Sequence, residues 1–188
     1  MTHFVLASAS PRRLALLKQI GLVPAEVVAT DIDETPHAGE LPRALALRLA
    51  REKAIAASAP NAVVLAADTV VGCGRRILPK AETAADAQLC LDLLSGRAHV
   101  VVTGVAVAHK GVVRARAVMT RVRFKRLGVT EMQSYVASGE WQGKAGGYGI
   151  QGRAERFVLS INGSYSAIVG LPLYETAGLL QHAGVVAP

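Results

Sequence analysis

The chain has 188 residues, of which 51% are hydrophobic by a broad count and 4% are aromatic. Its 21 Lys and Arg residues outnumber 14 Asp and Glu residues, so its formal charge is +7. The length predicts one domain over residues 1–188, and the aliphatic content excludes intrinsic disorder. The longest apolar runs, such as residues 62–67, are strand-sized, and they fall far short of the ~18 residues of a transmembrane helix.

The excess positive charge is confined to the second half of the chain. Residues 1–94 hold ten basic and ten acidic residues, whereas residues 95–188 hold eleven and four. Between Arg97 and Arg126 there are eight basic residues and no acidic one, so a nucleic-acid-binding module is one alternative. Phe124 is the only aromatic residue in this stretch, which counts against single-strand binding. We interpret the alternating basic residues of 114–125 as a solvated strand face that changes side near residues 117–120.

Only two cysteines are present, and they predict the redox environment. Cys73 and Cys90 lie far apart in the sequence, with no CxxC motif and no histidine at metal-ligand spacing. This pattern is typical of a reducing compartment and argues against a disulfide scaffold or a structural zinc site. We therefore expect a cytoplasmic protein.

The first half of the chain alternates predicted strands and helices. Residues 4–7 form an apolar strand, and residues 10–21 form a helix that is capped by Ser10 and ends at Gly21. A short strand follows at residues 25–29, and an acidic loop occupies residues 31–34. Residues 41–58, rich in Ala and Leu and bounded by prolines, predict a long helix.

The middle of the chain predicts the core strands. Residues 62–67 form a β-branched run typical of a fully buried strand, with Asp68 and Thr69 at its carboxyl end. Residues 83–94 predict a helix with Thr83 as its cap. Two long strands follow at residues 100–108 and 112–124.

The last part of the chain predicts smaller elements. Residues 130–138 form a short helix capped by Thr130, and Asn162-Gly163 predicts a hairpin between strands at residues 157–161 and 165–169. A final helix begins at Pro172 and runs to about residue 182. Because helices alternate with strands early and antiparallel pairs dominate later, we expect a mixed α/β sheet.

The segment Ser8-Ala9-Ser10-Pro11-Arg12-Arg13 predicts an anion site. A strand ends there and a helix begins, which leaves backbone N–H groups unpaired at the positive end of the helix dipole. Arg12 and Arg13 add donors suited to phosphate, although cations oppose the dipole at this position. The alternative is an ordinary capped helix whose arginines point into solvent.

Several further residues gain meaning only in combination. Asp68 and Glu34 offer carboxylates that can hold a divalent cation, and Asp68 can also accept a proton from water. The alternative for Asp68 is an aspartate that caps the following turn, and the alternative for Glu34 is a solvated acidic loop. Lys53 and Lys80 are surface lysines unless the fold brings them to one cleft. Residues 147–152 read GxGxxG, but no helix follows them, so we reject a dinucleotide fingerprint. This loop, with Gln151, suits a flat ligand or serves a structural purpose alone.

Taken together, these motifs resemble the Maf family of nucleoside triphosphate pyrophosphatases. The matching blocks keep the family order and include residues 6–13, 31–34, 50–54, 67–71, 94–97, 101–105, 144–152, 161–165 and 170–173. The resemblance implies a mixed α/β fold, with a long twisted sheet flanked by helices and two lobes around a central cleft, as in inosine triphosphatases. It also implies hydrolysis of a nucleoside triphosphate to the monophosphate and pyrophosphate, with Mg²⁺ or Mn²⁺ as cofactor.

The resemblance also assigns roles to particular residues. Asp68 matches the proton acceptor and, with Glu34, the metal-side carboxylates. The family positions that govern substrate choice are matched here by Arg12, Thr69 and Gln151. The positions that bind phosphate are matched by Ser8, Arg13, Lys53 and Lys80. Asp68-Thr69 and the loop with Gln151 resemble the branch that prefers dTTP and UTP, while Ala81 replaces the proline usual after the lysine.

Beyond catalysis, family resemblance implies a homodimer with a nucleoside triphosphate as partner, and no stable nucleic-acid or membrane partner is expected. A nucleotide-binding regulator of cell division with little turnover is the remaining alternative. The sequence leaves open whether the substrate is a canonical or a modified pyrimidine triphosphate.

Overall fold

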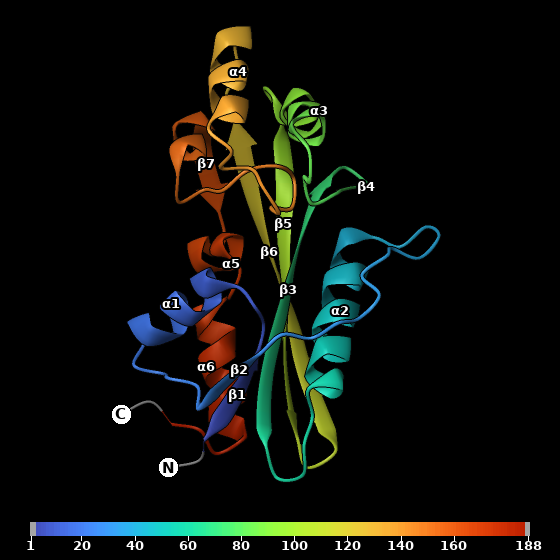
Figure 1. Ribbon diagram of the computed structural model, residues 1–188, viewed down its shortest axis with the longest axis vertical. Helices are drawn as coiled ribbons and strands as arrows, with labels where there is room; N and C mark the ends of the chain where they lie inside the picture. The colour runs from blue at the N-terminus through green and yellow to red at the C-terminus, as the bar shows by residue number, and fades with distance from the viewer. Residues whose placement is uncertain (1–2, 187–188) are drawn as a thin grey trace.

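The structure, a computed structural model, describes residues 3–186, so the predicted domain over residues 1–188 extends two residues beyond it at each end. Its sheet has seven strands in the order β2-β1-β3-β5-β6-β7, with β4 attached to β3 (Figure 1). The strands are β1 (Phe4–Ala7), β2 (Glu26–Val28), β3 (Val63–Cys73), β4 (Arg76–Leu78), β5 (Ala98–His109), β6 (Val112–Phe124) and β7 (Val158–Asn162). The helices are α1 (Pro11–Gln19), α2 (Pro42–Ala56), α3 (Ala84–Leu94), α4 (Val129–Ala137), α5 (Tyr165–Val169) and α6 (Leu173–His182), with a 3₁₀ turn at Arg153–Phe157.

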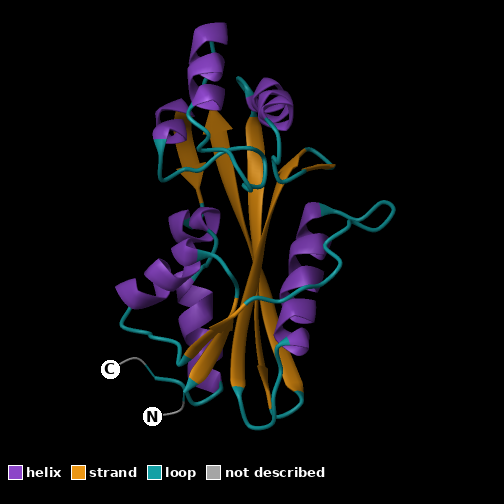
Figure 2. Ribbon diagram, in the orientation of Figure 1, coloured by secondary structure: helices purple, strands orange, loops and turns teal. Residues whose placement is uncertain are grey.

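The sheet is mixed, as the sequence predicts. β1 runs parallel to β2 and β3, because α1 and α2 form the crossover connections, and all other pairs are antiparallel. Strands β3, β5 and β6 are 11, 12 and 13 residues long and twist through the whole molecule (Figure 2). They therefore connect one group of helices at each end of the molecule, which gives two lobes. No helix within residues 3–186 has the length and apolar character needed to cross a bilayer.

The helices cover the two faces of the sheet unequally. One continuous apolar cluster packs α1 and α6 against one end of one face and α3 and α4 against the other end (Figure 1). On the opposite face, α2 alone covers the middle and lower part of the sheet. Within residues 3–186, no helix covers the far end of that face.

Two glycines allow α2 to lie unusually close to the sheet. A Cβ atom at Gly104 would overlap the carbonyl oxygen of Ala46 and lie 2.5 Å from its carbonyl carbon. At Gly72 it would lie 2.5 Å from a ring carbon of Pro42, the first residue of α2. Because a side chain at either position would collide with the helix, these glycines set the distance between α2 and the sheet.

The predicted hairpin around Asn162-Gly163 is wrong. Residues 158–162 do form β7, which pairs with β6, but Tyr165–Val169 is a helix. The Ser164 hydroxyl accepts a hydrogen bond from Ala167 N at 3.2 Å and caps this helix, so a capping serine outweighs the β-branched composition. The expected Thr130 cap is also displaced, because α4 begins at Val129 and Glu131 accepts a hydrogen bond from Gly128 N.

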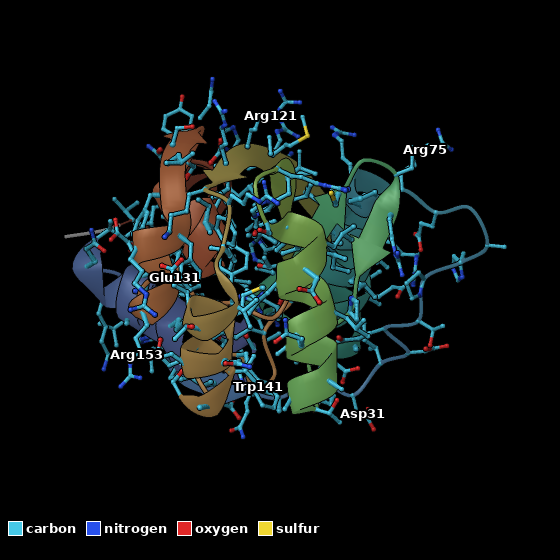
Figure 3. The ribbon with its side chains drawn as sticks, turned by 90° about the horizontal axis from the view of Figure 1, so that it is seen from above. Asp31, Arg75, Arg121, Glu131, Trp141 and Arg153 are labelled. Carbon is cyan, nitrogen blue, oxygen red and sulfur yellow. The ribbon has the colours of Figure 1, made fainter. Side chains whose placement is uncertain are left out.

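The basic residues of β6 do not form one surface. The register between β5 and β6 is continuous, so alternation along β6 is unbroken and no bulge causes the predicted change of face. Arg114 and Arg116 are exposed on one face, whereas Arg121 and Arg123 are exposed on the other, beyond the end of α2. Arg121 points away from the sheet in Figure 3. The change of side arises because different helices cover the two faces.

Candidate functional site

A cleft of about 630 Å³ opens beside β3, between the lobes. Strand β1 pairs with β3 only up to Ala66, and β4 pairs with it only from Val71. On the edge of β3 that faces away from β5, no strand of the described part of the chain therefore pairs with residues 67–70, and the cleft lies against this gap. All of the site residues predicted from the sequence line it: Ser8, Arg12, Arg13, Glu34, Lys53, Asp68, Thr69, Lys80 and Gln151.

Asp68 lies in the middle of β3 rather than after its end, which corrects the sequence prediction. The strand continues because Val70 and Val71 are β-branched and buried, and because the carboxylate of Asp68 has a partner. Asp68 is 3% exposed, and its Oδ1 accepts a hydrogen bond from Lys53 Nζ at 2.6 Å. A buried charge in a core strand is thus held by an opposite charge from α2.

Lys53 is not the surface lysine that its helix alone would predict. It is 7% exposed, and its ammonium group also contacts Glu34 Oε1 at 2.6 Å. Glu34 in turn forms an ion pair with Lys80, so four charges alternate along the cleft. Burial raises the pKa of Glu34, but hydrogen bonds from Lys53 and Lys80 outweigh burial and hold this pKa below its usual value.

Arg13 is the next cation along the cleft, and no carboxylate contacts it among residues 3–186. Its Nε donates to Gly170 O at 2.8 Å, Nη1 donates to Ser8 Oγ at 2.9 Å and Nη2 donates to Thr69 Oγ1 at 3.4 Å. Three of its five N–H groups are used, which leaves two for a ligand. Burial is the main cause that lowers the pKa of Arg13, and an anionic ligand would relieve the cost of burying this cation.

The hydroxyl of Thr69 has a fixed direction. Thr103 Oγ1 donates its single proton to Ala167 O at 2.7 Å. The 2.9 Å contact between Thr69 and Thr103 therefore uses the proton of Thr69, whose oxygen accepts from Arg13. Thr69 thus keeps one lone pair for a ligand and has no proton left to donate.

The glycine-rich loop forms the opposite wall of the cleft, and aromatic residues hold it from behind. The hydroxyl of Tyr148 bonds with His99 Nε2 at 2.8 Å, and Gly149 N donates to the hydroxyl of Tyr135 at 3.2 Å. Burial lowers the pKa of His99 to about 4, so the ring is neutral at pH 7. Trp141, beside α4 in Figure 3, donates to Val136 O at 2.7 Å and fixes the start of the loop. Gln151 projects from this supported wall.

The carboxylates present suit a hard divalent cation that also binds phosphate. Within residues 3–186, no three His, Cys, Asp or Glu side chains gather as a complete metal site. Glu34 and Asp68 do converge, because both contact the ammonium group of Lys53. Mg²⁺ usually takes one or two carboxylates together with substrate phosphates, so this pair fits such an ion.

Other residues of the site were not singled out by the sequence analysis. Gly104 lies opposite Asp68 in the strand register and lets α2 approach; its sequence signal is a glycine inside the apolar run of residues 100–108. Lys144 and Glu140 also line the cleft. Lys144 opens the matching block of residues 144–152 but was given no role, and Glu140 lies outside every matching block. The only sequence signal of His99 is a histidine at the start of a strand.

The fold and the cleft define a mixed α/β protein with a site for a polyanionic ligand. A family model described as Maf-like protein matches residues 3–183, and the chain belongs to this family. It is 63% identical over 181 residues to a dTTP/UTP pyrophosphatase of Hyphomonas neptunium, with 96% of this chain and 95% of that protein covered. A dTTP/UTP pyrophosphatase of Caulobacter vibrioides is 61% identical over 183 residues, at 96% and 95% coverage. Among solved structures, a HAM1 protein from Coxiella burnetii aligns with this chain at a TM-score of 0.47 and 19% sequence identity. The alignment covers 68% of this chain and 75% of the HAM1 chain.

Proposed function

We propose that this protein hydrolyses pyrimidine nucleoside triphosphates, dTTP and UTP among them, to the monophosphate and pyrophosphate. The observation that carries the proposal is the alternating chain Lys80–Glu34–Lys53–Asp68 beside the open edge of β3. Five cations and three carboxylates line the cleft, a balance that suits a polyphosphate bound with a metal ion. Relatives about 60% identical are named for this activity.

Asp68 accepts the proton of the attacking water in this proposal. Its Oδ1 bonds to Lys53, and its Oδ2 has no hydrogen-bond partner among residues 3–186. Water attacks the α-phosphorus and gives its proton to Asp68. The bond from the α-phosphorus to the oxygen that bridges it to the β-phosphorus breaks, and pyrophosphate leaves. Lys53 holds the carboxylate in place and, with Arg13 and Lys80, stabilises the charge that grows on the phosphate oxygens.

Glu34 and Asp68 are the residues that would hold Mg²⁺ or Mn²⁺. Such an ion would supply charge stabilisation on the phosphate oxygens when it is bound. Ser8 acts with Arg13, since its hydroxyl accepts from Arg13 Nη1 and orients the guanidinium toward the phosphates. Arg12, Thr69 and Gln151, which line the same cleft, select the substrate.

One assay tests the proposed activity. Pyrophosphate release is measured from a panel of canonical and modified pyrimidine triphosphates and from purine triphosphates, with Mg²⁺ or Mn²⁺. We expect Asp68→Asn to reduce kcat at least about 100-fold while the protein remains folded. Asp92→Asn, at an exposed position on α3, is the matched control and retains activity. Absence of pyrophosphate release from every nucleotide, or near-normal turnover by Asp68→Asn, would refute the proposal.

We also propose a cytoplasmic homodimer that acts as one domain and forms no stable complex with nucleic acid. The two free cysteines support a cytoplasmic location, and the family resemblance supports a homodimer. The division of the basic residues of β6 between two faces supports the absence of a stable nucleic-acid complex. Light scattering after gel filtration gives the mass in solution. Titration with labelled DNA and RNA at two salt concentrations tests for nucleic-acid binding.

A further inference from the structure

The polar side chains of the cleft fall into two groups. Around Asp68 the charges bond to one another, and Arg13 bonds to three oxygens. Arg12, Lys144 and Gln151 differ, because their side chains make no hydrogen bond or ion pair with any residue of the described range 3–186. The second group therefore leaves all of its donors for a ligand.

The backbone around Lys144 is firmly attached to the segment that carries Lys80. Ala81 N donates to Lys144 O at 3.1 Å, Gly143 N donates to Ala81 O at 2.9 Å and Gly146 N donates to Pro79 O at 2.9 Å. Residues 80 and 145 form an isolated antiparallel bridge. These bonds place Lys144 on a fixed part of the cleft wall and not on a mobile loop tip.

The side chain of Lys144 is held over Gly149. A Cβ atom at Gly149 would lie 2.8 Å from Lys144 Cε and 3.0 Å from Cδ, so a side chain there would make the lysine stem shift. The ammonium group extends beyond this contact, 3.9 Å from the same position. The stem is packed and half-buried while its charge faces the cleft.

The surroundings of Lys144 do not neutralise it. Burial is the largest cause that lowers the pKa of its ammonium group, the charge of Arg12 lowers this pKa further, and Glu140 only partly opposes them. Glu140 itself accepts one hydrogen bond from Arg153 N at 2.7 Å and forms an ion pair with the Arg153 side chain. Two neighbouring cations without their own carboxylate are stabilised when ligand oxygens approach them.

We propose that Lys144 is a specificity-determining residue that donates a hydrogen bond to the C4 carbonyl of a uracil or thymine base. This inference rests on the proposed function. The Gln151 amide, which lines the same cleft, can both donate and accept, and this suits a base whose N3–H is flanked by carbonyl oxygens. Cytosine has an amino group at C4, and that donor would face the ammonium group without an acceptor. A site built around a hydrogen bond rejects the analogue that lacks it.

The test compares bases rather than overall rates. Lys144→Met keeps a stem of similar length over Gly149 and removes the charge, and Lys144→Arg keeps the charge. We expect Lys144→Met to raise the KM for dTTP and UTP about 10-fold to 100-fold, to change the KM for dCTP and CTP less than about 3-fold, and to retain kcat. Lys144→Arg should recover part of the preference. Lys18→Met, at an exposed position on α1, is the matched control.

Equilibrium binding of dTMP and dCMP by calorimetry gives a second readout that needs no turnover. Equal losses for all four triphosphates would assign Lys144 to the phosphates, and unchanged KM values would leave it in solvent; either result overturns the inference. If the wild-type protein released no pyrophosphate, the proposed function would fail, and the inference would still be decided by binding. Preferential loss of dTMP affinity in Lys144→Met supports it, and equal or absent loss overturns it.

Discussion

Gly104→Ala tests whether the close approach of α2 builds the site. Gly104 is the register partner of Asp68, and a Cβ there would lie 2.5 Å from the carbonyl carbon of Ala46. Carbon atoms in contact are ordinarily ~3.5 Å apart, so α2 must move by about 1 Å. The 2.6 Å bond between Lys53 and Asp68 would stretch beyond hydrogen-bond range. We expect a loss of about 2–4 kcal/mol in the free energy of unfolding, from overpacking and from the weakened charged bond, together with a large loss of turnover.

Urea denaturation and pyrophosphate release measure the two effects of Gly104→Ala. Gly178→Ala is the matched control, because Gly178 lies inside α6 and, apart from its chain neighbours and the backbone of that helix, no atom lies within 4 Å of an added Cβ. That variant should gain up to about 1 kcal/mol, since alanine favours the helix. A Gly104→Ala protein within about 0.5 kcal/mol of the wild type and with unchanged turnover would show that α2 tolerates the side chain, and the argument from close approach would be refuted.

Three further results are expected. Burial lowers the pKa of His99 from 6.5 to about 4, so between these pH values the unfolded chain binds a proton that the folded chain does not. The free energy of unfolding should therefore fall by about 3 kcal/mol as the pH drops from 6.5 to 4. In urea titrations, His99→Gln should make this dependence on pH less steep. Thr83→Ala should cost about 1 kcal/mol, because Thr83 Oγ1 accepts from Asp86 N at 3.1 Å, and Thr83→Ser should restore most of it. Removal of divalent cations with EDTA should abolish pyrophosphate release, and Mg²⁺ or Mn²⁺ should restore it; full activity in EDTA would contradict the assignment of Glu34 and Asp68.

Much of the architecture follows from local patterns in the sequence. The apolar runs at residues 62–67 and 100–108 predict core strands, and Thr83 predicts the start of α3 correctly because its capping box is local. The end of β3 could not be predicted in this way. An aspartate after an apolar run usually marks a strand end, and here it is tolerated inside the strand only because Lys53 reaches it from another element.

The candidate site divides in the same manner. The residue types that suit phosphate and metal are visible in the sequence, and the fold brings all of them to one cleft. Lys144 and His99 were missed because their significance depends on long-range contacts. Lys144 lies near Arg12, which is far away in the sequence, and His99 bonds to Tyr148 on another element. No local spacing records these relations.

The position of Asp68 links the stability of the protein to its proposed chemistry. A carboxylate in a core strand costs free energy unless a cation reaches it, and that cation must come from a helix lying over the same face. Gly104 allows this approach, while the gap between β1 and β4 exposes the same stretch of β3 to ligand. The buried pair is therefore open on one side to substrate and supported on the other by close backbone packing. A substitution that widened the packing would weaken both the fold and the placement of the proton acceptor, so stability and turnover should decline together in variants at this helix–sheet contact.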